Sequence, residues 1–446
     1  MADERPWAGR RLHLIGLGGA GMSGYARVAT QLGAAVSGSD RADSAGLRAL
    51  EAIGVDVHVG HAAANVPAGE GVEVVHSTAI PRDNPERAAA RERSLPDLPR
   101  AELLAQLSAL KRTIAIAGAH GKTTTTSMTA HVLLRCGLEP AYLIGGALTT
   151  TGLNADWGAG EWLVVEADES DRSMLSLHVD VAVVTNVELD HHATYGSLAE
   201  VREAFRALLA GAPQAVLWDR PDVLALRGDA PHVAFDVPAP ALDGGGSSFE
   251  WRGHAVRLAV PGAHNARNAA AALEAAVLAG ADPAAAAAAL ADFAGAGRRF
   301  QTLGATSGGA RVIDDYAHHP TEVAATIDAA RTLRPRRVVA VFQPHLYSRT
   351  QRLAREFGAA LARADVAAVL DVYPARERAE DFPGVTGLLV AEAAADAAGG
   401  RPVMWLPTFD VAEPVLRGLL REGDLCLVLG AGDVDELGRR LVAAGS

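Results

Sequence analysis

The chain has 446 residues, which is too long for a single ordinary hydrophobic core, so two to four domains are expected. A hydrophobic fraction of 49% with 21% charged residues is typical of a globular protein and excludes wholesale disorder. The net charge of −12 gives no support for a general nucleic-acid-binding or membrane-surface role, although local loops can still bind anions.

The cysteines and the apolar segments bear on the compartment. Cys136 and Cys426 have neither metal-binding nor redox spacing, and we interpret them as reduced buried thiols. The first residues lack the apolar segment of a signal peptide, and no run of about 18 uncharged apolar residues predicts a membrane span. We therefore expect a cytoplasmic protein.

The first strand–loop–helix unit carries a glycine-rich motif. A predicted strand, Arg11–Ile15, runs into Gly16-Leu-Gly-Gly-Ala-Gly21, and a helix follows to about Leu32. A second strand, Ala34–Val36, leads to Asp40, about twenty residues past the glycines. This is the pattern of a dinucleotide-binding site with an acidic residue for a ribose. NAD, another nucleotide diphosphate in the same cradle and a structural turn are all compatible with it.

A later strand of the same unit ends in small hydroxyl side chains. The strand Val72–Val75 is followed by His76-Ser-Thr-Ala-Ile80, which suits a ligand in the crevice of a sheet or a plain turn. The charged, proline-containing segment 87–100 closes this unit. A helix over Ala101–Leu110 then links it to a second unit that begins near residue 107.

The second unit opens with the order of a phosphate-binding loop. Thr113–Ala117 predicts a buried strand, Gly118-Ala-His-Gly121 a turn and Thr124–Arg135 a helix. Backbone N–H groups would bind phosphate, Lys122 would reach the outer phosphates, and the Thr123 hydroxyl would ligate Mg²⁺. The full Walker spacing is absent, because Ile stands five positions before the last glycine, so a tight structural turn is the alternative. We expect ATP as the energy source.

Two later strands of this unit also end in polar residues. Trp162–Val165 is followed by Glu166-Ala-Asp-Glu-Ser-Asp171, and Val181–Thr185 by Asn186-Val-Glu-Leu-Asp-His-His192. Carboxylates after a buried strand suit a Mg²⁺ site opposite a phosphate loop. A solvated acidic turn and a structural histidine are the alternatives.

A third glycine-rich segment, residues 244–248, predicts a loop without chemistry. Residues 261–268 open an alanine-rich helix, in which Asn265 and Asn268 share one face and suit either a cap or the reading of a base. The six alanines at 284–289 follow Asp282-Pro283 and predict another helix.

The segment Gly295–Gln301 predicts a hinge. Arg298 and Arg299 could clamp phosphates there or lie in a basic surface turn. A third unit starts near residue 304 and alternates strands with helices. Its predicted strands end in polar stretches, and this alternation indicates a doubly wound α/β domain; three of them are Val338–Phe342, Val366–Asp371 and Asp424–Gly430.

Eight motifs occur in one order along nearly the whole chain, and together they resemble the Mur ligases of peptidoglycan synthesis. The motifs are Gly16-Leu-Gly-Gly-Ala-Gly-Met-Ser-Gly24, Gly118-Ala-His-Gly-Lys-Thr-Thr-Thr125, Glu166-Ala-Asp-Glu-Ser-Asp171, Thr185-Asn-Val-Glu-Leu-Asp-His191, His264-Asn-Ala-Arg-Asn268, Gly297-Arg-Arg-Phe300, Asp314-Asp-Tyr-Ala-His-His-Pro-Thr-Glu322 and Phe342-Gln-Pro-His-Leu-Tyr-Ser-Arg-Thr350. The chain is most similar to members that add L-alanine to UDP-N-acetylmuramate. Members that attach a preformed tripeptide in cell-wall recycling share most of these motifs and remain the alternative.

The resemblance implies an α/β fold of three domains. Residues 1–106 would form a Rossmann-like domain for the UDP-sugar, 107–303 a central P-loop domain for ATP, and 304–446 a Rossmann-like domain for ATP and the amino acid. The implied reaction transfers the γ-phosphoryl group of ATP to the lactyl carboxylate of UDP-N-acetylmuramate. L-Alanine then displaces phosphate from the acyl phosphate. ATP and Mg²⁺ would be required, and the resemblance implies no nucleic-acid partner.

The same resemblance implies the residues of each site. The UDP-sugar would lie on Gly18, Gly19, Ala20, Gly21, Met22, Asp40, Ser77 and Thr78. ATP would contact Gly118, Ala119, His120, Gly121, Lys122, Thr123, Thr124, His264, Asn265, Asn268, Arg299 and Asp315. Mg²⁺ would be held by Thr123, Glu166 and His191, and the amino acid by Tyr316, His318, His345 and Arg349. Lys122, His191, His318 and Arg349 are the expected catalytic residues.

The sequence departs from the family pattern in two places. Leu346 stands where many members have an arginine, which would leave more of the amino-acid carboxylate to Arg349. No lysine occurs within 162–200, where sister ligases carry a carbamylated lysine, so none is predicted here. A nicotinamide oxidoreductase and a non-catalytic nucleotide-binding module are the competing readings. The first leaves Lys122 and Glu166 without a role, and the second leaves the third unit's histidines and arginines unexplained.

Overall fold

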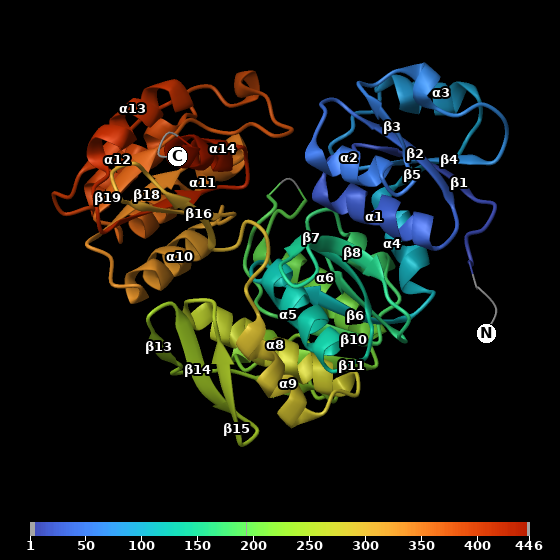
Figure 1. Cartoon of the computed structure of the whole chain (residues 1–446), viewed down its shortest axis with the longest axis horizontal. Helices are drawn as coiled ribbons and strands as arrows, with labels where there is room; N and C mark the ends of the chain where they lie inside the picture. Colours follow the sequence, from blue (N-terminus) through green and yellow to red (C-terminus); the bar gives the residue numbers. More distant parts are fainter. Residues whose placement is uncertain (1–4, 193, 444–446) are drawn as a thin grey trace. The chain divides into compact units, whose positions relative to one another are not determined.

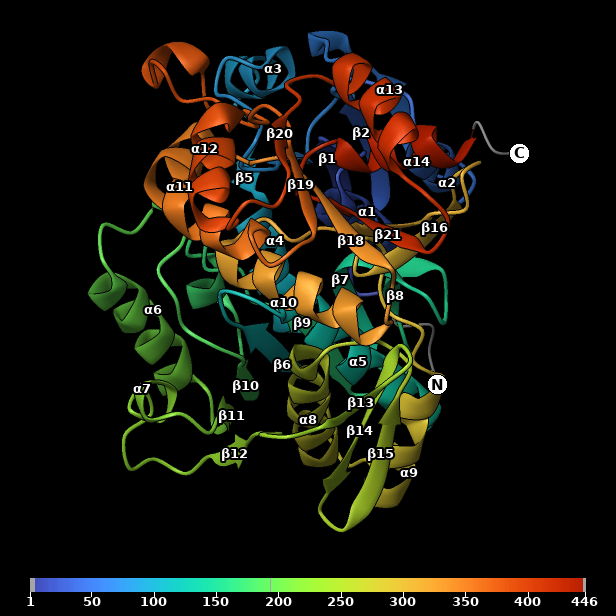
Figure 2. The same ribbon diagram turned by 90° about the vertical axis from the view of Figure 1, so that its left-hand side faces the viewer.

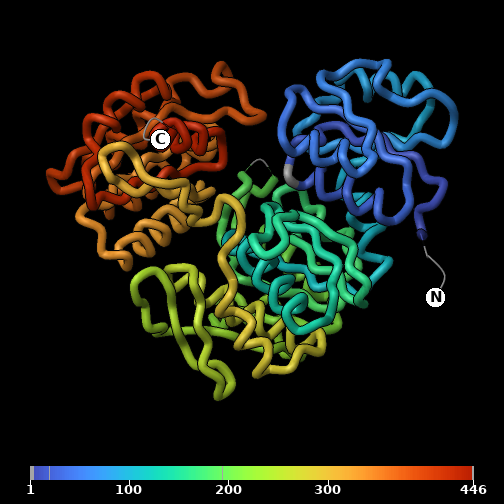
Figure 3. Tube along the Cα trace, in the orientation of Figure 1, coloured from blue at the N-terminus to red at the C-terminus, as the bar shows by residue number. Residues whose placement is uncertain are grey.

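The computed structural model describes residues 5–192 and 194–443 (Figure 1). The chain forms two compact units, each made of stretches that are separate in sequence, as the trace in Figure 3 allows the reader to follow. The first unit comprises Met1–Leu189, Ser197–Asp236 and Ala271–Ala289, and the second comprises Asp190–Gly196, Val237–Ala270 and Leu290–Ser446.

The first sheet is parallel, with the order β3-β2-β1-β4-β5. β1 pairs with β2 on one side and β4 on the other, so the strand order reverses at its carboxyl end, where ligands bind in such sheets. The strands are β1 Arg11–Ile15, β2 Ala35–Asp40, β3 Asp56–Val59, β4 Val72–His76 and β5 Asp97–Pro99. The helices are α1 Ala20–Gln31, α2 Ala45–Glu51, α3 Pro85–Glu92 and α4 Arg100–Ser108, with a 3₁₀ turn η1 at Ala63–Asn65.

The second sheet has the order β12-β11-β10-β6-β9-β7-β8, and only β8 runs antiparallel to its neighbour. β6 lies between β10 and β9, so the loop after β6 begins between two other strand ends. The strands are β6 Arg112–Ala117, β7 Ala141–Leu148, β8 Leu153–Trp157, β9 Trp162–Glu166, β10 Val181–Val184, β11 Gln214–Trp218 and β12 Val233–Phe235. The helices are α5 Lys122–Arg135, α6 Leu198–Gly211 and α7 Pro221–Leu224, with η2 at Ser173–Ser176.

A small antiparallel sheet, β13-β14-β15, precedes the alanine-rich helices. Asp282 accepts the backbone N–H of Ala285 at 2.9 Å, which confirms the predicted helix start before the alanine run. The elements are β13 Ala241–Asp243, β14 Gly246–Trp251, β15 His254–Leu258, α8 Ala263–Leu278, α9 Pro283–Ala289 and η3 Leu290–Asp292.

The fourth sheet has the order β16-β17-β21-β18-β19-β20 and is parallel except for β16. Figure 2 shows α10, α11 and α12 on one face and α13 and α14 on the other. The strands are β16 Gln301–Ala305, β17 Arg311–Asp315, β18 Arg337–Phe342, β19 Val366–Val369, β20 Val403–Trp405 and β21 Asp424–Leu429. The helices are α10 Pro320–Thr332, α11 Tyr347–Leu361, α12 Gly387–Ala397, α13 Phe409–Leu419 and α14 Val434–Ala443, with η4 at Ala379–Asp381.

The apolar composition of the central strands explains this layering. β21 is buried along its whole length, and in β18 only Arg337 is partly exposed. Strands covered on both faces read as continuous apolar runs, because neither face meets water. Alternate residues of these strands enter two separate cores: Phe342 packs with Phe357 of α11, whereas Val341 belongs to the core of α13 and α14. The predicted doubly wound domain is thereby confirmed.

Several predicted boundaries differ from the structure, among them those of β2, α5 and the loop at 244–248. β2 continues to Asp40 instead of ending at Val36, because Ser37, Gly38 and Ser39 are themselves buried in the sheet. α5 begins at Lys122 rather than Thr124, directly after the left-handed Gly121. The predicted loop at 244–248 is shorter, since β14 starts at Gly246.

Two further features of the chain concern its environment. Within residues 5–192 and 194–443, no helix is both long and apolar enough to cross a membrane. Cys136 and Cys426 are free thiols, as predicted, but only Cys426 is buried, whereas Cys136 at the end of α5 is partly exposed. Burial raises the pKa of Cys426 to about 12, which keeps this thiol protonated.

A buried carboxylate ties the first sheet to the chain around it. Glu86, in the first turn of α3, is fully buried and accepts hydrogen bonds from Ser39 Oγ at 2.6 Å and Asn65 Nδ2 at 2.7 Å. Burial opposes its ionisation, but contacts with the His13, Ser39 and Asn65 side chains outweigh burial and lower the pKa of Glu86 to about 2. The residue therefore stabilises the fold as an anion.

We expect Glu86→Gln to lower the free energy of unfolding by about 2 kcal/mol at pH 7, since charged hydrogen bonds are lost. The pKa of Glu86 is lower in the folded chain, at about 2, than its ordinary value of 4.5, which applies to the unfolded chain. The ionised carboxylate therefore stabilises the fold above about pH 4.5, and this stabilisation is lost as the pH falls toward 2. The difference between wild type and variant should therefore shrink over that range in urea denaturation at pH 7, 4 and 3.

Glu73→Gln is the matched control, because Glu73 pairs with Arg10 at a partly exposed position and should contribute less than about 1 kcal/mol. A wild-type advantage over Glu86→Gln that stays constant from pH 7 to pH 3 would contradict the buried-anion account.

Candidate functional site

The loop after β6 requires glycine at its first position. Gly118 has φ of 141°, and a Cβ built on it would lie 2.0 Å from Thr185 Oγ1. No side chain fits at that distance, so the backbone of the loop can approach the end of β10 only because Gly118 has none. Gly121, with φ of 83°, then makes the left-handed turn that starts α5.

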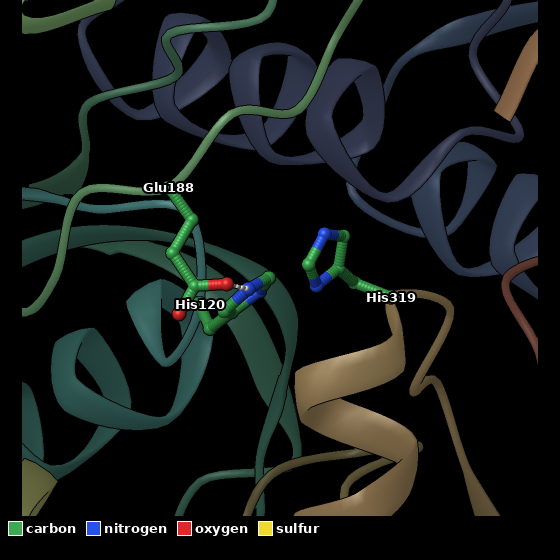
Figure 4. Close-up of side chains that lie close together, drawn as sticks. All are labelled: His120, Glu188 and His319. Carbon is green, nitrogen blue, oxygen red and sulfur yellow. Dashed lines mark hydrogen bonds and ion pairs between the residues drawn. The ribbon is translucent and has the colours of Figure 1, made fainter. Parts of the chain in front are cut away.

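The end of β10 holds this loop in place. His120 donates its backbone N–H to Asn186 Oδ1 at 2.9 Å, and its carbonyl accepts from Thr185 Oγ1 at 2.6 Å and Asn186 Nδ2 at 2.9 Å. Its ring lies 3.2 Å from a Glu188 carboxylate oxygen, as Figure 4 shows. The loop backbone is therefore held as a rigid turn, as a phosphate-binding loop requires, with the His120 N–H itself bonded to Asn186.

Lys122 lies among carboxylates at the beginning of α5. Its ammonium donates to the Gly118 carbonyl at 2.6 Å and to Glu169 at 3.0 Å. Burial alone would lower the pKa of Lys122, but Glu169 and Asp168 outweigh burial and raise it. The same ammonium, with Arg100, lowers the pKa of Asp168 to about 2 against the opposing effect of burial. Lys122 is thus a permanent cation held at the loop.

Thr123 and Glu166 bring oxygen ligands together beside that cation. The Thr123 hydroxyl donates to Glu166 Oε2 at 3.1 Å, and Gly145 N–H donates to Glu166 Oε1 at 2.6 Å. A hydroxyl and a carboxylate are the hard oxygen donors that Mg²⁺ prefers, so these two residues fit such an ion. His191, the third predicted ligand, belongs to the second unit.

The first glycine loop is braced by Asp40. Gly18 N–H donates to Asp40 Oδ2 at 2.7 Å, and a Cβ on Gly18 would lie 2.9 Å from the same oxygen. Asp40 therefore orders the loop in addition to any ligand contact. Met22 is buried and offers only its backbone, whereas Thr78 is exposed and Ser77 partly exposed. Ala20, which was also predicted for the UDP-sugar, is the first residue of α1.

Arg100 connects the two loops of the first unit. Its guanidinium donates to Asp168 at 2.8 Å and to Asp171 at 3.5 Å. The same group would lie 3.5 Å from a Cβ on Gly21 of the first glycine loop. Tyr25 of α1 is buried beside these charges, and burial raises its pKa to about 12. One side chain thus reaches both the first glycine loop and the acidic segment next to Lys122.

The second unit contains a histidine–tyrosine cluster formed by Tyr316, His318, His345 and Tyr373. Neighbouring ring centroids are 5.4 Å, 6.0 Å and 5.8 Å apart, and His345 stacks on Tyr373. Burial lowers the pKa of His318 to about 4 and that of His345 to about 3. Both imidazoles are therefore neutral at pH 7.

The hydrogen-bond partners assign the tautomers of these two rings. His318 Nδ1 lies 2.9 Å from the Tyr316 carbonyl, which can only accept, so Nδ1 carries the proton and Nε2 is an acceptor. His345 Nδ1 lies 3.3 Å from Arg349 Nη1, which can only donate, so Nε2 of His345 is the donor. The cluster therefore offers one acceptor and one donor to a small amphoteric ligand.

Arg349 makes a buried ion pair with Asp190. Its Nε and Nη2 lie 3.0–3.1 Å from the Asp190 carboxylate, and the two side chains are 4% and 5% exposed. Burial opposes ionisation of Asp190, but Arg349 outweighs it and holds the pKa of that carboxyl well below its usual range. The guanidinium predicted for the amino-acid carboxylate is thus paired with a carboxylate of the protein, and its Nη1 lies 3.3 Å from His345 Nδ1.

The hinge before β16 is fixed by two arginines and an aspartate. Arg298, one of two predicted phosphate clamps, donates to Asp314 at 3.1 Å and to the Gly430 and Gly432 carbonyls. These contacts tie Arg298 to its own sheet, and its predicted role as a phosphate clamp stays a prediction. Arg299 faces Glu322 at 3.8 Å.

Asp315 accepts the backbone N–H groups of Phe300 and Ala317 at 2.8 Å each, and burial raises its pKa to about 6. Its carboxylate thus orders the hinge backbone. His319, drawn in Figure 4, caps α10 with Glu322 in a reciprocal capping box.

The start of α8 places the two predicted asparagines together. Asn265 donates its side-chain amide to the Pro261 carbonyl at 2.7 Å, and Asn268 donates to Asn265 Oδ1 at 3.3 Å. Both asparagines are buried. Their side-chain amides bond the Pro261 carbonyl and each other rather than a free backbone N–H at the helix start, so the contacts are not those of a helix cap. Burial also lowers the pKa of His264 to about 4.

Several residues around these sites were not singled out from the sequence. Glu169 and Asp190 lie inside recognised motifs, where the acidic cluster at 166–171 and the histidine that follows Asp190 were the available signals. Arg100 and Tyr373 lie in segments with no motif. Their roles depend on partners far away in the chain, for which the sequence carries no local pattern.

Family models match three consecutive parts of the chain. They are described as Mur ligase family, catalytic domain, over residues 11–112, Mur ligase middle domain over 116–276, and Mur ligase, glutamate ligase domain, over 298–432.

Relatives match over almost the full length. UDP-N-acetylmuramate–L-alanine ligase of Thermobifida fusca is 46% identical over 97% of this chain and 96% of its own. The protein of the same name from Rubrobacter xylanophilus is 45% identical over 97% and 99%. The crystal structure of UDP-N-acetylmuramate–alanine ligase from Thermotoga maritima has a TM-score of 0.81 at 27% identity, covering 97% of this chain and 98% of that one. A murein peptide ligase from Psychrobacter arcticus, 24% identical with a TM-score of 0.74 over 98% and 99%, shares the fold.

The Asp190–Arg349 pair generates a stability prediction. Asp190→Asn or Arg349→Met should each cost about 3–5 kcal/mol, because either change leaves one buried charge without its partner. The double variant should cost clearly less than the sum, and a double-mutant cycle by urea denaturation measures the difference.

The exposed pair of Arg363 and Asp328 in the same unit is the control, and its cycle should give less than about 1 kcal/mol. Additive effects at Asp190 and Arg349 would show that the two side chains do not depend on each other.

Proposed function

The chain belongs to the Mur ligase family, and on that premise we propose that it joins L-alanine to the lactyl carboxylate of UDP-N-acetylmuramate with ATP as the energy source. The observation that carries this proposal is the likeness of 45–46% identity over the whole chain to relatives named for that reaction. The products would be UDP-N-acetylmuramoyl-L-alanine, ADP and phosphate. We assign the reaction to the cytoplasm and to peptidoglycan synthesis.

We propose three domains, each of which binds a different part of the substrate set. Residues 1–106 bind the UDP-sugar, 107–303 bind ATP, and 304–446 contribute to ATP and amino-acid binding. Support comes from the separate sheets, of which only the strand β16 Gln301–Ala305 crosses a proposed boundary, and from the order of the three matched family models. The sugar nucleotide is proposed on the Gly18–Met22 loop with Asp40, Ser77 and Thr78, rather than NAD.

The first half of the reaction needs an activated carboxylate. A carboxylate repels an amine and has no good leaving group, so its oxygen attacks the γ-phosphorus of ATP and the β–γ bond breaks to give an acyl phosphate and ADP. Catalysis of this step consists of positioning and charge neutralisation. We assign the γ-phosphoryl group to Lys122, whose raised pKa keeps it positive. The other phosphates are assigned to the loop from Gly118 to Thr124, where every backbone N–H except that of His120, which bonds Asn186, is proposed as a donor.

Thr123 and Glu166 are the proposed Mg²⁺ ligands of the first unit, and His191 is proposed as a further ligand. When bound, the ion neutralises phosphate charge during transfer. His264, Asn265, Asn268, Arg299 and Asp315 are proposed on the nucleotide side. Before ATP binds, the Lys122 ammonium is bonded to Glu169 and lies in the field of Asp168. The γ-phosphate would therefore take the place of these carboxylates as the partner of Lys122.

The second half of the reaction is attack by the alanine amine. The amine must lose a proton, and the unprotonated Nε2 of His318 is an acceptor for the N–H. Nε2–H of His345 is a donor for the alanine carboxylate, and Tyr316 borders the same cluster. Attack on the acyl carbon forms the amide and expels phosphate. Arg349, bonded to Asp190, acts here by holding His345.

Addition of a preformed tripeptide finds no support in these relatives. Those at 45–46% identity are named as alanine ligases, and the murein peptide ligase at 24% identity shares the fold alone.

The decisive measurement is phosphate release from ATP with Mg²⁺ and UDP-N-acetylmuramate, adding either L-alanine or the L-Ala-D-Glu-diamino acid tripeptide. We expect alanine-dependent release and a sugar nucleotide that is heavier by one alanine residue on mass spectrometry. Release that requires the tripeptide would overturn the single-alanine assignment while leaving the acyl-phosphate chemistry in place.

Lys122→Ala should abolish alanine-dependent phosphate release, because the γ-phosphoryl group loses its cation. Binding of UDP-N-acetylmuramate, measured by calorimetry, should persist, since the sugar nucleotide is proposed on the Gly18–Met22 loop. Lys111→Ala is the control, because Lys111 bonds the Gly158 carbonyl away from the loop. Loss of both activities in Lys122→Ala alone would refute the division of the two sites.

A further inference from the structure

The histidine–tyrosine cluster supplies hydrogen bonds for an amino acid, but the arginine closest to it supplies no net charge. Arg349 contacts Asp190 through two nitrogens at 3.0–3.1 Å, and both side chains are buried. An α-carboxylate brought to this pair meets as much negative as positive charge. Recognition of the carboxylate therefore requires another cation.

The other arginines beside the cluster are also opposed by carboxylates. Arg298, whose guanidinium lies 5.0 Å from the Tyr316 ring, is bonded to Asp314. Arg299, at 5.1 Å from the same ring, faces Glu322. Leu346, which follows His345, is buried and apolar, so it adds no charge.

The loop from Tyr373 to Glu377 lies against the start of α11. Tyr373 donates its N–H to the Pro344 carbonyl at 2.8 Å and accepts from Leu346 N–H at 2.9 Å. The Glu377 carboxylate accepts the N–H of Ser348 at 2.9 Å. The loop is thus fastened at both ends to the segment that carries His345.

Arg376 lies between these two fastened ends. The preceding Ala375 has a left-handed φ of 50°, so the backbone turns sharply just before Arg376. The side chain is exposed, and within residues 5–192 and 194–443 it has no hydrogen-bond or ion-pair partner. Its charge helps to lower the pKa of His345, after burial and His318, which agrees with a position near that ring.

We propose that Arg376 binds the α-carboxylate of the incoming amino acid together with Nε2–H of His345. A guanidinium presents parallel N–H donors that match a carboxylate, and an arginine without a partner loses no ion pair on binding. The inference rests on the proposed function and identifies the cation that recognises its amino-acid substrate. It makes Arg376 a specificity residue, because acceptors that lack the carboxylate would gain nothing from it.

The test compares wild type, Arg376→Ala, Arg376→Lys and Arg378→Ala in the alanine-dependent phosphate-release assay. Arg378 is the matched control, since it is exposed in the same loop and pairs with Glu380 at 3.3 Å. We expect Arg376→Ala to raise the KM for L-alanine about 10- to 100-fold, as for loss of a charged hydrogen bond, with the KM for ATP unchanged. Arg376→Lys should fall between, and Arg378→Ala should match wild type.

L-Alaninamide, which lacks the carboxylate, separates recognition from a structural role. If alaninamide is an acceptor, its KM is measured; if it only competes with L-alanine, its inhibition constant is measured. Either constant should be the same in wild type and Arg376→Ala. A KM for L-alanine within twofold of wild type, or an equal loss for alanine and alaninamide, would overturn the inference. A wild type without alanine-dependent release would overturn the proposed function and this inference with it, whereas an active wild type with an unaffected Arg376→Ala overturns the inference alone.

Discussion

The parallel pairing of β6 with β9 on one side and β10 on the other is the constraint on which the first unit depends. Parallel neighbours bring their carboxyl ends to one edge, so three segments distant in sequence become adjacent there. The loop after β6 supplies backbone N–H groups and Lys122, the end of β9 supplies Glu166 and Glu169, and the end of β10 supplies Asn186. These side chains meet because β6 lies between β9 and β10.

The second unit follows a different principle, in which each buried cation is neutralised by the protein itself. Arg349 is bonded to Asp190, and the partly buried Arg298 is bonded to Asp314. A buried charge without a partner is costly, so such pairs give the segments a defined geometry more than they add net stability. The neutral imidazoles of His318 and His345 can then be held at fixed positions, with tautomers set by their neighbours.

The sequence predicts the local features of this molecule well. The strands Arg11–Ile15 and Val338–Phe342, the glycine turns and the alanine helix follow from periodicity and turn chemistry, which act over a few residues. Predicted boundaries failed where tertiary packing decided the conformation, as at β2, whose hydroxyl and glycine residues are buried between neighbours.

The candidate sites were predictable as positions but not as contacts. Lys122 and Thr123 could be named from their motif, yet the partner of Arg349 lies 159 positions away and that of Arg100 lies 68 away. No local pattern encodes such pairs, because they arise from the packing of whole elements. For the same reason the neutralisation of Arg349, which alters its expected role, could be recognised only in the folded chain.

Arg100 gives the first unit a means of thermodynamic linkage. Its guanidinium touches Asp168 and lies over Gly21, so one cation is shared between two loops. An anionic ligand at Gly21 that draws this cation toward itself leaves Asp168 with Lys122 as its remaining cation, which alters the charge presented to a second anion. Linkage is reciprocal, so the first ligand changes the binding free energy of the second by the same amount as the second changes that of the first. Occupancy of one loop would thus set the affinity of the other without any movement of the sheets.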